Sequence, residues 1–476
     1  MIRGVRTGSV PGFLRRHWLL VLLLVAGLAL RVVVQLAYRP ALLYIDSFRY
    51  LADLGVFYPG GINPIGYGAF LLPLLTIGDL AFVAAVQHLL GLGLGVWIYA
   101  LLRRHGAPNW LAALAAAPVL LDAYQLQIEH NIMSDLLFQA VLLGAVHLLT
   151  RARPGPRTAA LAGVLLGCAV LVRLVGVTLV LPAAVFVLLA AGCRPADGWR
   201  RRIRSAGALV AGFAVLLGGY AVYNLAWTGV PALSGSTGSV VYGRTAVVAD
   251  CPALDLTPAE ELVCPDEPVA QRELTGIDHY IHFYAVQHRV AEELPEGTDL
   301  GSVQGSFARK VLLHQPDDVL AGVLTDFLKG FAPTRTQAPG DVPLHRWQFQ
   351  TEYPLHAEQW YVAEWAELHD GGTVHADPEL AGFLRAYQLG GGYTPGTLLG
   401  LAFVPAALAV LGVGRARRSG LRAICLLPAG LAVAVLGTAA AMEFSWRYQL
   451  PGLVLLPVAA ALGLTALFGP RTGNER

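Results

Sequence analysis

The strongest constraint on the fold of this chain is a series of apolar runs long enough to cross a bilayer. About 20 apolar residues span the hydrocarbon core, and fewer suffice where a span ends in interfacial loops. The sequence contains ten such runs, at residues 18–38, 80–102, 108–121, 135–150, 158–172, 177–192, 205–227, 394–412, 421–442 and 450–468. Because lipid offers the backbone no hydrogen-bond partners, we predict an all-α polytopic membrane protein with about ten transmembrane helices.

Composition and charge support this class and exclude others. Of the 476 residues, 55% are hydrophobic and 14% are charged, whereas soluble domains carry about 25% charged residues. Residues 228–394 hold 9 basic and 23 acidic residues, while the rest of the chain holds 25 arginines and 9 acidic residues. This segregation indicates two compartments rather than a nucleic-acid partner. The first run has full spanning length and no small-residue cleavage site, so we expect a span there rather than a signal peptide.

The arginines orient the predicted bundle, because short cytoplasmic loops are enriched in Arg and Lys. They occur at the N-terminus, at the C-terminus and in every second loop, as Arg3, Arg6, Arg15, Arg16, Arg103, Arg104, Arg151, Arg153, Arg157, Arg194, Arg200, Arg201, Arg202, Arg204, Arg415, Arg417, Arg418, Arg471 and Arg476. We therefore expect a multi-pass plasma-membrane protein with both termini in the cytoplasm and residues 228–394 outside.

This topology predicts three parts, which are a seven-span membrane module at 1–227, an extracytoplasmic acidic domain at 228–394 and three C-terminal spans at 395–476. The first external loop is 39–79. Apolar residues at helical spacing in 44–54 predict an interfacial helix there, and 69–75 predicts a second one that is too short to cross. The acidic domain is expected to be mainly helical, with one amphipathic helix at 302–331. Cys251 and Cys264 lie where the compartment permits a disulfide, and both the paired and the free state remain open.

Ionisable residues at the outer face are the candidates for chemistry, since no nucleotide-binding, metal-binding or common hydrolase motif occurs. Asp46 and Arg49 are three residues apart, so on a helix they share a face. They are either a surface ion pair or a carboxylate and a guanidinium aimed at one phosphosugar. Arg173 and Arg447 lie between spans on the same side, where an arginine suits a lipid phosphate or snorkels to lipid head groups.

A second polar group surrounds the start of the fourth span. Glu129 and His130 cap no obvious helix, which favours a functional role. Asp135 follows Ser134 directly before an apolar run, a pattern equally typical of a helix start. Arg31 lies inside the first span, and we expect it to pair within the bundle.

Short motifs occur in order along the chain, namely Asp46-Ser47-Phe48-Arg49-Tyr50 and Pro64-Ile65-Gly66-Tyr67, followed by residues 87–91, 133–138, 171–173, 223–229 and 447–448. This series resembles the motifs of the GT-C superfamily of polyprenyl-phosphate-dependent glycosyltransferases, especially the protein O-mannosyltransferase and lipid A aminoarabinose transferase branch. Ser47 replaces the second acidic residue of the family motif, and a lysine that some relatives place near the second interfacial helix is absent.

This resemblance implies a GT-C-like fold and inverting transfer of one sugar from a polyprenyl phosphate to a hydroxyl acceptor, without a nucleotide. It implies that Asp46 is the catalytic base and that Arg49, Arg173 and Arg447 bind the donor phosphate. Substrate contacts are expected from Tyr50, Tyr67, Glu129, His130 and Asp135. A divalent cation, Mg²⁺ or Mn²⁺, would be held by Asp46 and Glu129. The expected partners are the lipid-linked sugar, membrane lipid and an acceptor that is a cell-envelope glycan, a glycolipid or a protein.

Three alternatives remain. A lipid-linked glycan ligase or polymerase would rely on external arginines and a histidine rather than on Asp46. A transporter or flippase would show charge pairs near the bilayer centre and internal symmetry, neither of which the sequence indicates. A non-catalytic assembly subunit would tolerate loss of the outer carboxylates.

Overall fold

The computed structural model describes residues 10–52, 54–151, 155–190, 198–284, 290–354, 362–369 and 371–469. Of the arginines used for orientation, Arg3, Arg6, Arg153, Arg194, Arg471 and Arg476 lie outside this part of the chain. Within it the chain is predominantly helical, with a single two-stranded sheet.

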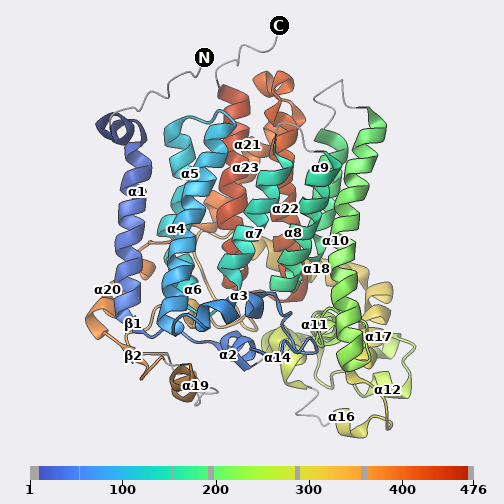
Figure 1. The fold of residues 1–476 in the computed structure, drawn as a ribbon. Coiled ribbons are helices and arrows are strands. Elements are labelled where there is room, and N and C mark those ends of the chain that lie inside the picture. The colour runs from blue at the N-terminus through green and yellow to red at the C-terminus, as the bar shows by residue number, and fades with distance from the viewer. Residues whose placement is uncertain are drawn as a thin grey trace.

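A bundle of apolar helices forms the frame of the molecule (Figure 1). Every predicted apolar run contains a helix, namely α1 Val10–Ala37, α4 Leu80–Arg104, α5 Asn109–Leu121, α7 Asp135–Leu149, α8 Pro156–Val172, η1 Leu174–Leu179 with α9 Val180–Ala190, α10 Trp199–Thr228, α21 Gly396–Leu411, α22 Leu421–Met442 and α23 Leu450–Phe468. In the described chain, α1, α4, α10, α22 and α23 provide the five helices long and apolar enough to cross a membrane. The pair of α5 and α6 (Ala123–His130), bent by 51°, is a sixth candidate. The remaining bundle helices are apolar but shorter, so the count of ten spans stays a prediction.

Large apolar side chains point outward from the bundle. Val25 is 61% exposed, Val215 75% and Leu411 72%. Extended apolar surface of this kind is unusual on a soluble monomer and is expected where helices face lipid. The structure is that of a polytopic, all-α membrane protein.

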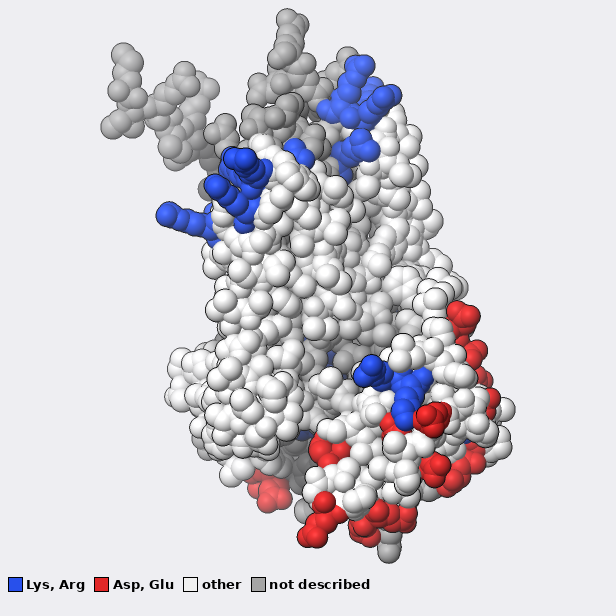
Figure 2. All heavy atoms as spheres, turned by 90° about the vertical axis from the view of Figure 1, so that its right-hand side faces the viewer, with Lys and Arg blue, Asp and Glu red and all other residues white. Residues whose placement is uncertain are grey.

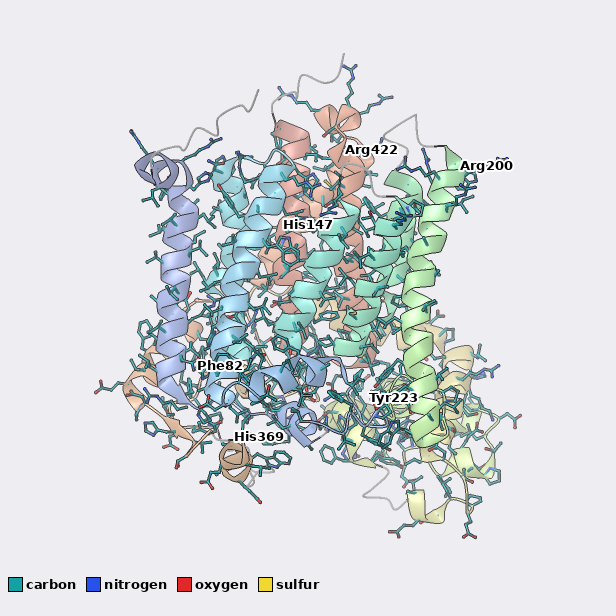
Figure 3. All side chains as sticks on the ribbon, viewed as in Figure 1. Phe82, His147, Arg200, Tyr223, His369 and Arg422 are labelled. Carbon is teal, nitrogen blue, oxygen red and sulfur yellow. A yellow bond between two sulfur atoms is a disulfide. The ribbon has the colours of Figure 1, made fainter. Side chains whose placement is uncertain are left out.

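Charge is segregated between the two ends of the bundle. Figure 2 shows Lys and Arg at one end, Asp and Glu together with a smaller group of Lys and Arg on the domain at the other, and a largely uncharged band between them. Arg200 and Arg422 lie at the first end, which we call the arginine end, and Tyr223 lies near the opposite one, the domain end (Figure 3). The segregation agrees with the sequence analysis, while the side of the membrane that each end faces stays a prediction.

The loop at 39–79 crosses the domain end with the two short helices that were predicted, α2 Ile45–Ala52 and α3 Gly66–Leu75. Their buried side chains, among them Phe48, Leu51 and Leu71, form one hydrophobic cluster. The loop is also fastened to the acidic domain, because β1 (Tyr38–Arg39) pairs antiparallel with β2 (His375–Ala376). These contacts hold α2 between the bundle and the acidic domain.

The acidic domain, residues 228–394, is mainly helical in its described parts. It contains α11 Thr237–Ala246, η3 Cys251–Ala253, α12 Pro258–Glu261, α13 Val269–Thr275, α14 Ile277–His282, α16 Val290–Glu293, α17 Leu300–His314, α18 Pro316–Lys329, η4 Leu344–Trp347, α19 Val362–Leu368 and α20 Pro378–Leu389. The prediction of a single helix at 302–331 is wrong, because two helices, α17 and α18, cover this segment. Pro316 has no amide hydrogen to continue α17 and instead starts α18. Cys251 and Cys264 form a disulfide.

Candidate active site

A cavity of about 490 Å³ lies at the domain end. Its wall is formed by α2, α14, η4, the junction of α8 and η1, and the junction of α22 and the short helix η6 (Trp446–Gln449). Five of the predicted site residues line it, namely Asp46, Arg49, Tyr50, Arg173 and Arg447. Part of its wall is apolar and consists of Val172, Leu174, Val175, Val240 and Met442. The cavity therefore combines a cluster of charges with a surface suited to hydrocarbon.

Arg447 is the centre of the charged cluster, because it bridges two carboxylates. Its Nη1 donates to Asp46 Oδ2 at 2.6 Å. Its Nε donates to both oxygens of Asp135, at 3.2 and 3.0 Å, and its Nη2 lies 2.9 Å from Asp135 Oδ2. The Arg447 side chain is 6% exposed and that of Asp135 is 4% exposed. Both charges are therefore buried together, which requires that they stay paired.

Two further arginines complete the cluster. Arg173 Nη1 lies 2.8 Å from Asp135 Oδ2, and its guanidinium sits over the Tyr448 ring, 5.6 Å from the centroid. Arg49 Nη1 donates to Asp46 Oδ1 at 3.2 Å and is one-third exposed. Three guanidinium groups thus face two carboxylates, which leaves one positive charge in excess within this group.

Local structure explains how these side chains meet. Asp46 and Arg49 lie on one face of α2, as their spacing predicted. Asp135 is the first residue of α7, where a helix favours a negative charge. Arg173 is the extended residue after α8, and Arg447 lies in the short helix η6, Trp446–Gln449. All these positions are helix ends or connections at the domain end.

The arginines fix the charge state of Asp46. Burial by itself would raise the pKa of this carboxyl, but Arg447 and Arg49 hold the pKa well below its ordinary value. Asp46 is consequently a carboxylate that is strongly engaged by its neighbours.

The two tyrosines that were predicted to bind substrate differ in their position relative to the cavity. Tyr50 lines the cavity and its hydroxyl lies 2.9 Å from Ser134 Oγ. Tyr67 is fully buried beneath it and donates to Gln87 Oε1 at 2.7 Å. The prediction that Tyr67 binds substrate is therefore corrected. Its hydroxyl is hydrogen-bonded to Gln87 of α4, and Tyr67 does not line the cavity.

The prediction for Asp135 is corrected in the same way. Asp135 is not among the residues that line the cavity. Both of its oxygens are engaged by Arg447 and Arg173. It pairs with Arg447 and Arg173 and holds them in place from behind the cavity wall.

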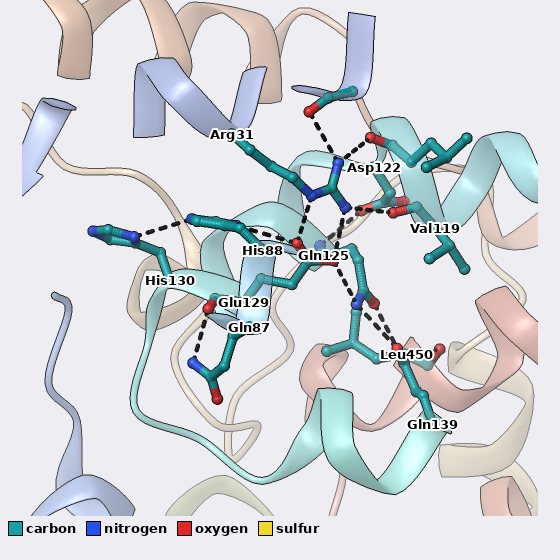
Figure 4. Close-up of polar contacts among 12 residues, drawn as sticks. Arg31, Gln87, His88, Val119, Asp122, Gln125, Glu129, His130, Gln139 and Leu450 are labelled. Carbon is teal, nitrogen blue, oxygen red and sulfur yellow. Dashed lines mark hydrogen bonds and ion pairs between the residues drawn. The ribbon is translucent and has the colours of Figure 1, made fainter. Parts of the chain in front are cut away.

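Glu129 and His130 belong to a separate buried network (Figure 4). Arg31 donates to both oxygens of Glu129, from Nη2 at 2.8 Å and from Nε at 2.9 Å. His88 Nδ1 lies 3.2 Å from Glu129 Oε2, and His88 Nε2 lies 3.1 Å from His130 Nδ1. His130 Nε2 in turn lies 2.8 Å from the carbonyl oxygen of Tyr38.

This network corrects the sugar-binding role predicted for Glu129 and His130 and confirms that Arg31 pairs within the bundle. Neither Glu129 nor His130 lines the cavity. A Cβ added at Gly91 would lie only 2.2 Å from Glu129 Oε1, so glycine at this position lets α6 approach α4. The motif at 87–91 therefore serves this packing.

The residues at the site do not fit the divalent cation that was expected. Glu129 is held by Arg31 and lies outside the cavity, so it does not join Asp46. Asp46 is itself engaged by two arginines. Among the described residues there is no group of three or more His, Cys, Asp and Glu side chains suited to a metal ion. The positive charge at this site comes from arginine.

Sequence reasoning missed several residues of the cavity wall, above all Asp278, His282, Trp347 and Glu443. Asp278 and His282 lie on α14 of the acidic domain, in a stretch without a motif. The available signal for Glu443 was its position four residues before Arg447, at the end of a span.

No protein-family model and no curated protein matches the sequence. Similar solved structures include the S. cerevisiae protein O-mannosyltransferase Pmt1-Pmt2 complex bound to the sugar donor, at 15% identity over 52% of this chain and 38% of that chain, with a TM-score of 0.34. The archaeal oligosaccharyltransferase AglB from Archaeoglobus fulgidus is similar at 12% identity over 95% and 50%, with a TM-score of 0.44. ArnT from Cupriavidus metallidurans bound to undecaprenyl phosphate is similar at 17% identity over 92% and 77%, with a TM-score of 0.32. The chain thus spans half or less of the first two.

These structures are of the GT-C kind that the sequence motifs resemble.

Proposed function

We propose that this protein is an inverting glycosyltransferase that moves one sugar from a polyprenyl-phosphate donor to a hydroxyl acceptor at the outer face of the plasma membrane. The observation that carries the proposal is the cluster of Arg49, Arg173 and Arg447 around the carboxylates of Asp46 and Asp135, in a cavity with an apolar wall. The acceptor is a cell-envelope glycan, a glycolipid or a protein.

The charge of the cluster suits this donor. A polyprenyl-phosphate sugar is a phosphodiester with one negative charge, which matches the positive charge in excess. Guanidinium groups bind phosphate oxygens in a fork, and the apolar residues Val175 and Met442 offer a surface to the first isoprene units. When the bond from the anomeric carbon to the phosphate oxygen breaks, the leaving phosphate gains a second negative charge. Preorganised arginines stabilise that charge, often the largest contribution in such sites.

Phosphate binding would also change the basicity of Asp46. The ion pairs with Arg447 and Arg49 keep its pKa low. When phosphate oxygens take these guanidinium donors, the ion pairs weaken and Asp46 becomes a stronger base. Asp46 then accepts the proton of the acceptor hydroxyl while the acceptor oxygen attacks the anomeric carbon from the face opposite the phosphate. General-base catalysis of this kind contributes about 10²- to 10⁴-fold.

Asp46→Asn tests the proposal. We expect it to reduce the release of free polyprenyl phosphate from a panel of polyprenyl-phosphate sugars by about 100-fold or more, because the amide cannot take the proton. The measurement uses purified protein with membrane extract as the source of acceptor. The control is Asp255→Asn, an exposed aspartate of the acidic domain. Turnover equal to that of the wild type in the Asp46 variant would contradict the mechanism.

Metal removal gives a second prediction. Arginines supply the positive charge at this site, and the site residues do not fit a divalent cation. We therefore expect turnover to change by less than about twofold when EDTA is added to the same assay. A loss of turnover that Mg²⁺ or Mn²⁺ restores would show that a cation takes part.

The alternatives predict other results. A glycan ligase or polymerase would keep its activity in Asp46→Asn, and an assembly subunit would show no turnover to lose. For a transporter, the buried charges near the bilayer centre would matter most. Arg31 lies six residues before the end of α1, about 9 Å along the helix axis, and its pair with Glu129 is the buried charge pair on which this alternative would depend.

A further inference from the structure

Glu443 has a carboxyl group in the cavity wall, and no ion pair joins this group to a Lys, Arg or His of the described residues. It follows the last residue of α22 and lines the cavity together with Asp46. Its Oε1 accepts a hydrogen bond from the Tyr448 hydroxyl at 2.9 Å. Its Oε2 is buried and has no hydrogen-bond partner among the described residues. Buried polar atoms are nearly always hydrogen-bonded, so a free oxygen on a residue that lines a cavity indicates a position that a ligand completes.

The charges around Glu443 differ from those around Asp46. Burial and the nearby Asp278 of α14 raise the pKa of Glu443 to about 7, and Asp46 acts in the same direction. Tyr448 and Arg447 act against this rise. Near neutral pH the carboxyl group of Glu443 therefore exists in both forms, one that accepts a hydrogen bond and one that also donates one. Two carboxyl groups of one cavity thus have their pKa values pushed in opposite directions, which is typical of groups with different roles.

His282 of α14 also lines this cavity. Burial lowers its pKa below the ordinary value for histidine. His282 therefore stays neutral near pH 7, and Glu443 is the group at this part of the wall that changes charge there.

We propose that Glu443 determines specificity by binding a hydroxyl group of a sugar through its free Oε2. The proposal rests on the proposed function, because the arginines place the donor phosphate in the same cavity and the sugar is bonded directly to that phosphate. The hydroxyl group can come from the donor sugar or from a sugar of the acceptor, which present the same chemistry to the carboxyl group.

Binding of two kinds of lipid to Glu443→Gln tests this proposal without requiring turnover. The probes are bare polyprenyl phosphate and polyprenyl-phosphate mannose or arabinose, titrated into detergent-solubilised protein across neutral pH. We expect the substitution to weaken binding of the sugar-bearing lipid by about 10-fold and to leave the bare lipid unchanged, because a hydrogen bond to a charged group is lost. The wild-type preference for the sugar-bearing lipid should vary around pH 7, and that of the variant should not. Glu352→Gln, an exposed glutamate, is the matched control.

The second arm measures the acceptor. If the donor preference is unchanged, a KM for acceptor about 10-fold higher in Glu443→Gln assigns the hydroxyl group to the acceptor and supports the proposal. Unchanged donor preference together with unchanged acceptor KM would overturn it. If the wild type fails to bind even bare polyprenyl phosphate, the proposed function fails and this inference falls with it. If the wild type binds the bare lipid normally and Glu443→Gln changes neither the donor preference nor the acceptor KM, this inference fails and the proposed function stands.

Discussion

Arg447→Met is expected to lower the turnover of the lipid-linked donor by about 10²- to 10³-fold, the loss typical when one preorganised donor to a developing negative charge is removed. Arg447 is the side chain that contacts both carboxylates of the cluster. The substitution also removes the cation that Asp46 and Asp135 share. Because Arg49 and Arg173 remain as their partners, we expect the loss in free energy of unfolding to stay below the about 3–5 kcal/mol typical of an uncompensated buried charge. Arg447→Lys should have an intermediate effect, since one ammonium group cannot reproduce the planar fork.

Two measurements separate catalysis from folding in this variant. Turnover is normalised to the folded fraction, which thermal unfolding in detergent reports. Combining Arg447→Met with Asp135→Asn leaves Arg173 without its carboxylate, so it should lower the stability further and restore none of the turnover. Arg200→Met, an exposed arginine at the opposite end of the bundle (Figure 3), is the matched control. Turnover of Arg447→Met within twofold of the wild type would contradict the role given to this arginine.

Arg31→Leu is expected to destabilise the protein by about 3–5 kcal/mol, because it leaves Glu129 charged, buried and unpaired. The two side chains are 2% and 0% exposed, and the Arg31 guanidinium also donates to the carbonyl oxygens of Gly27, Val119 and Leu120. One side chain thus joins α1, α5 and α6. The expected result is a lower midpoint of thermal unfolding, measured in detergent with and without denaturant.

A double-mutant cycle tests whether the pair itself carries this effect. Arg31→Leu combined with Glu129→Gln should be less destabilised than the sum of the single variants, since the neutral amide no longer needs a cation. Strict additivity would mean that Arg31 acts through packing alone. Because the network is separate from the cavity, turnover per folded molecule should stay close to that of the wild type in all three variants.

The helices of the bundle could be predicted because their information is local. Each apolar run is a continuous stretch of sequence, and each contains a helix in the structure. The division of 302–331 into α17 and α18 could also have been predicted, since Pro316 lies within the apolar pattern that led to one helix. The helix at 123–130 could not be predicted from apolar periodicity, because this segment is polar although α6 is buried.

The candidate site could be predicted only in part. Asp46 and Arg49 share a local helix face, and the membrane topology placed Arg173 and Arg447 on the same side. The partner of Glu129 could not be found in this way, because Arg31 is 98 residues away in sequence and packing of helices brings the two together. Glu443 acquires its environment from Asp278 of the acidic domain, for which no sequence pattern existed.

The central claim is that the arginine cluster binds the phosphate of a polyprenyl lipid, and affinity for that lipid tests it most directly, since neither the sugar nor the acceptor needs to be known. The measurement compares polyprenyl phosphate with polyprenol of the same length, on the wild type and on Arg49→Met. Arg49 is one-third exposed and has a single contact with Asp46, so its removal leaves the bridge by Arg447 intact. We predict a preference of the wild type for the phosphate of about 100-fold, reduced by about 10-fold in Arg49→Met. Equal affinity of the wild type for the phosphate and the alcohol would contradict the account.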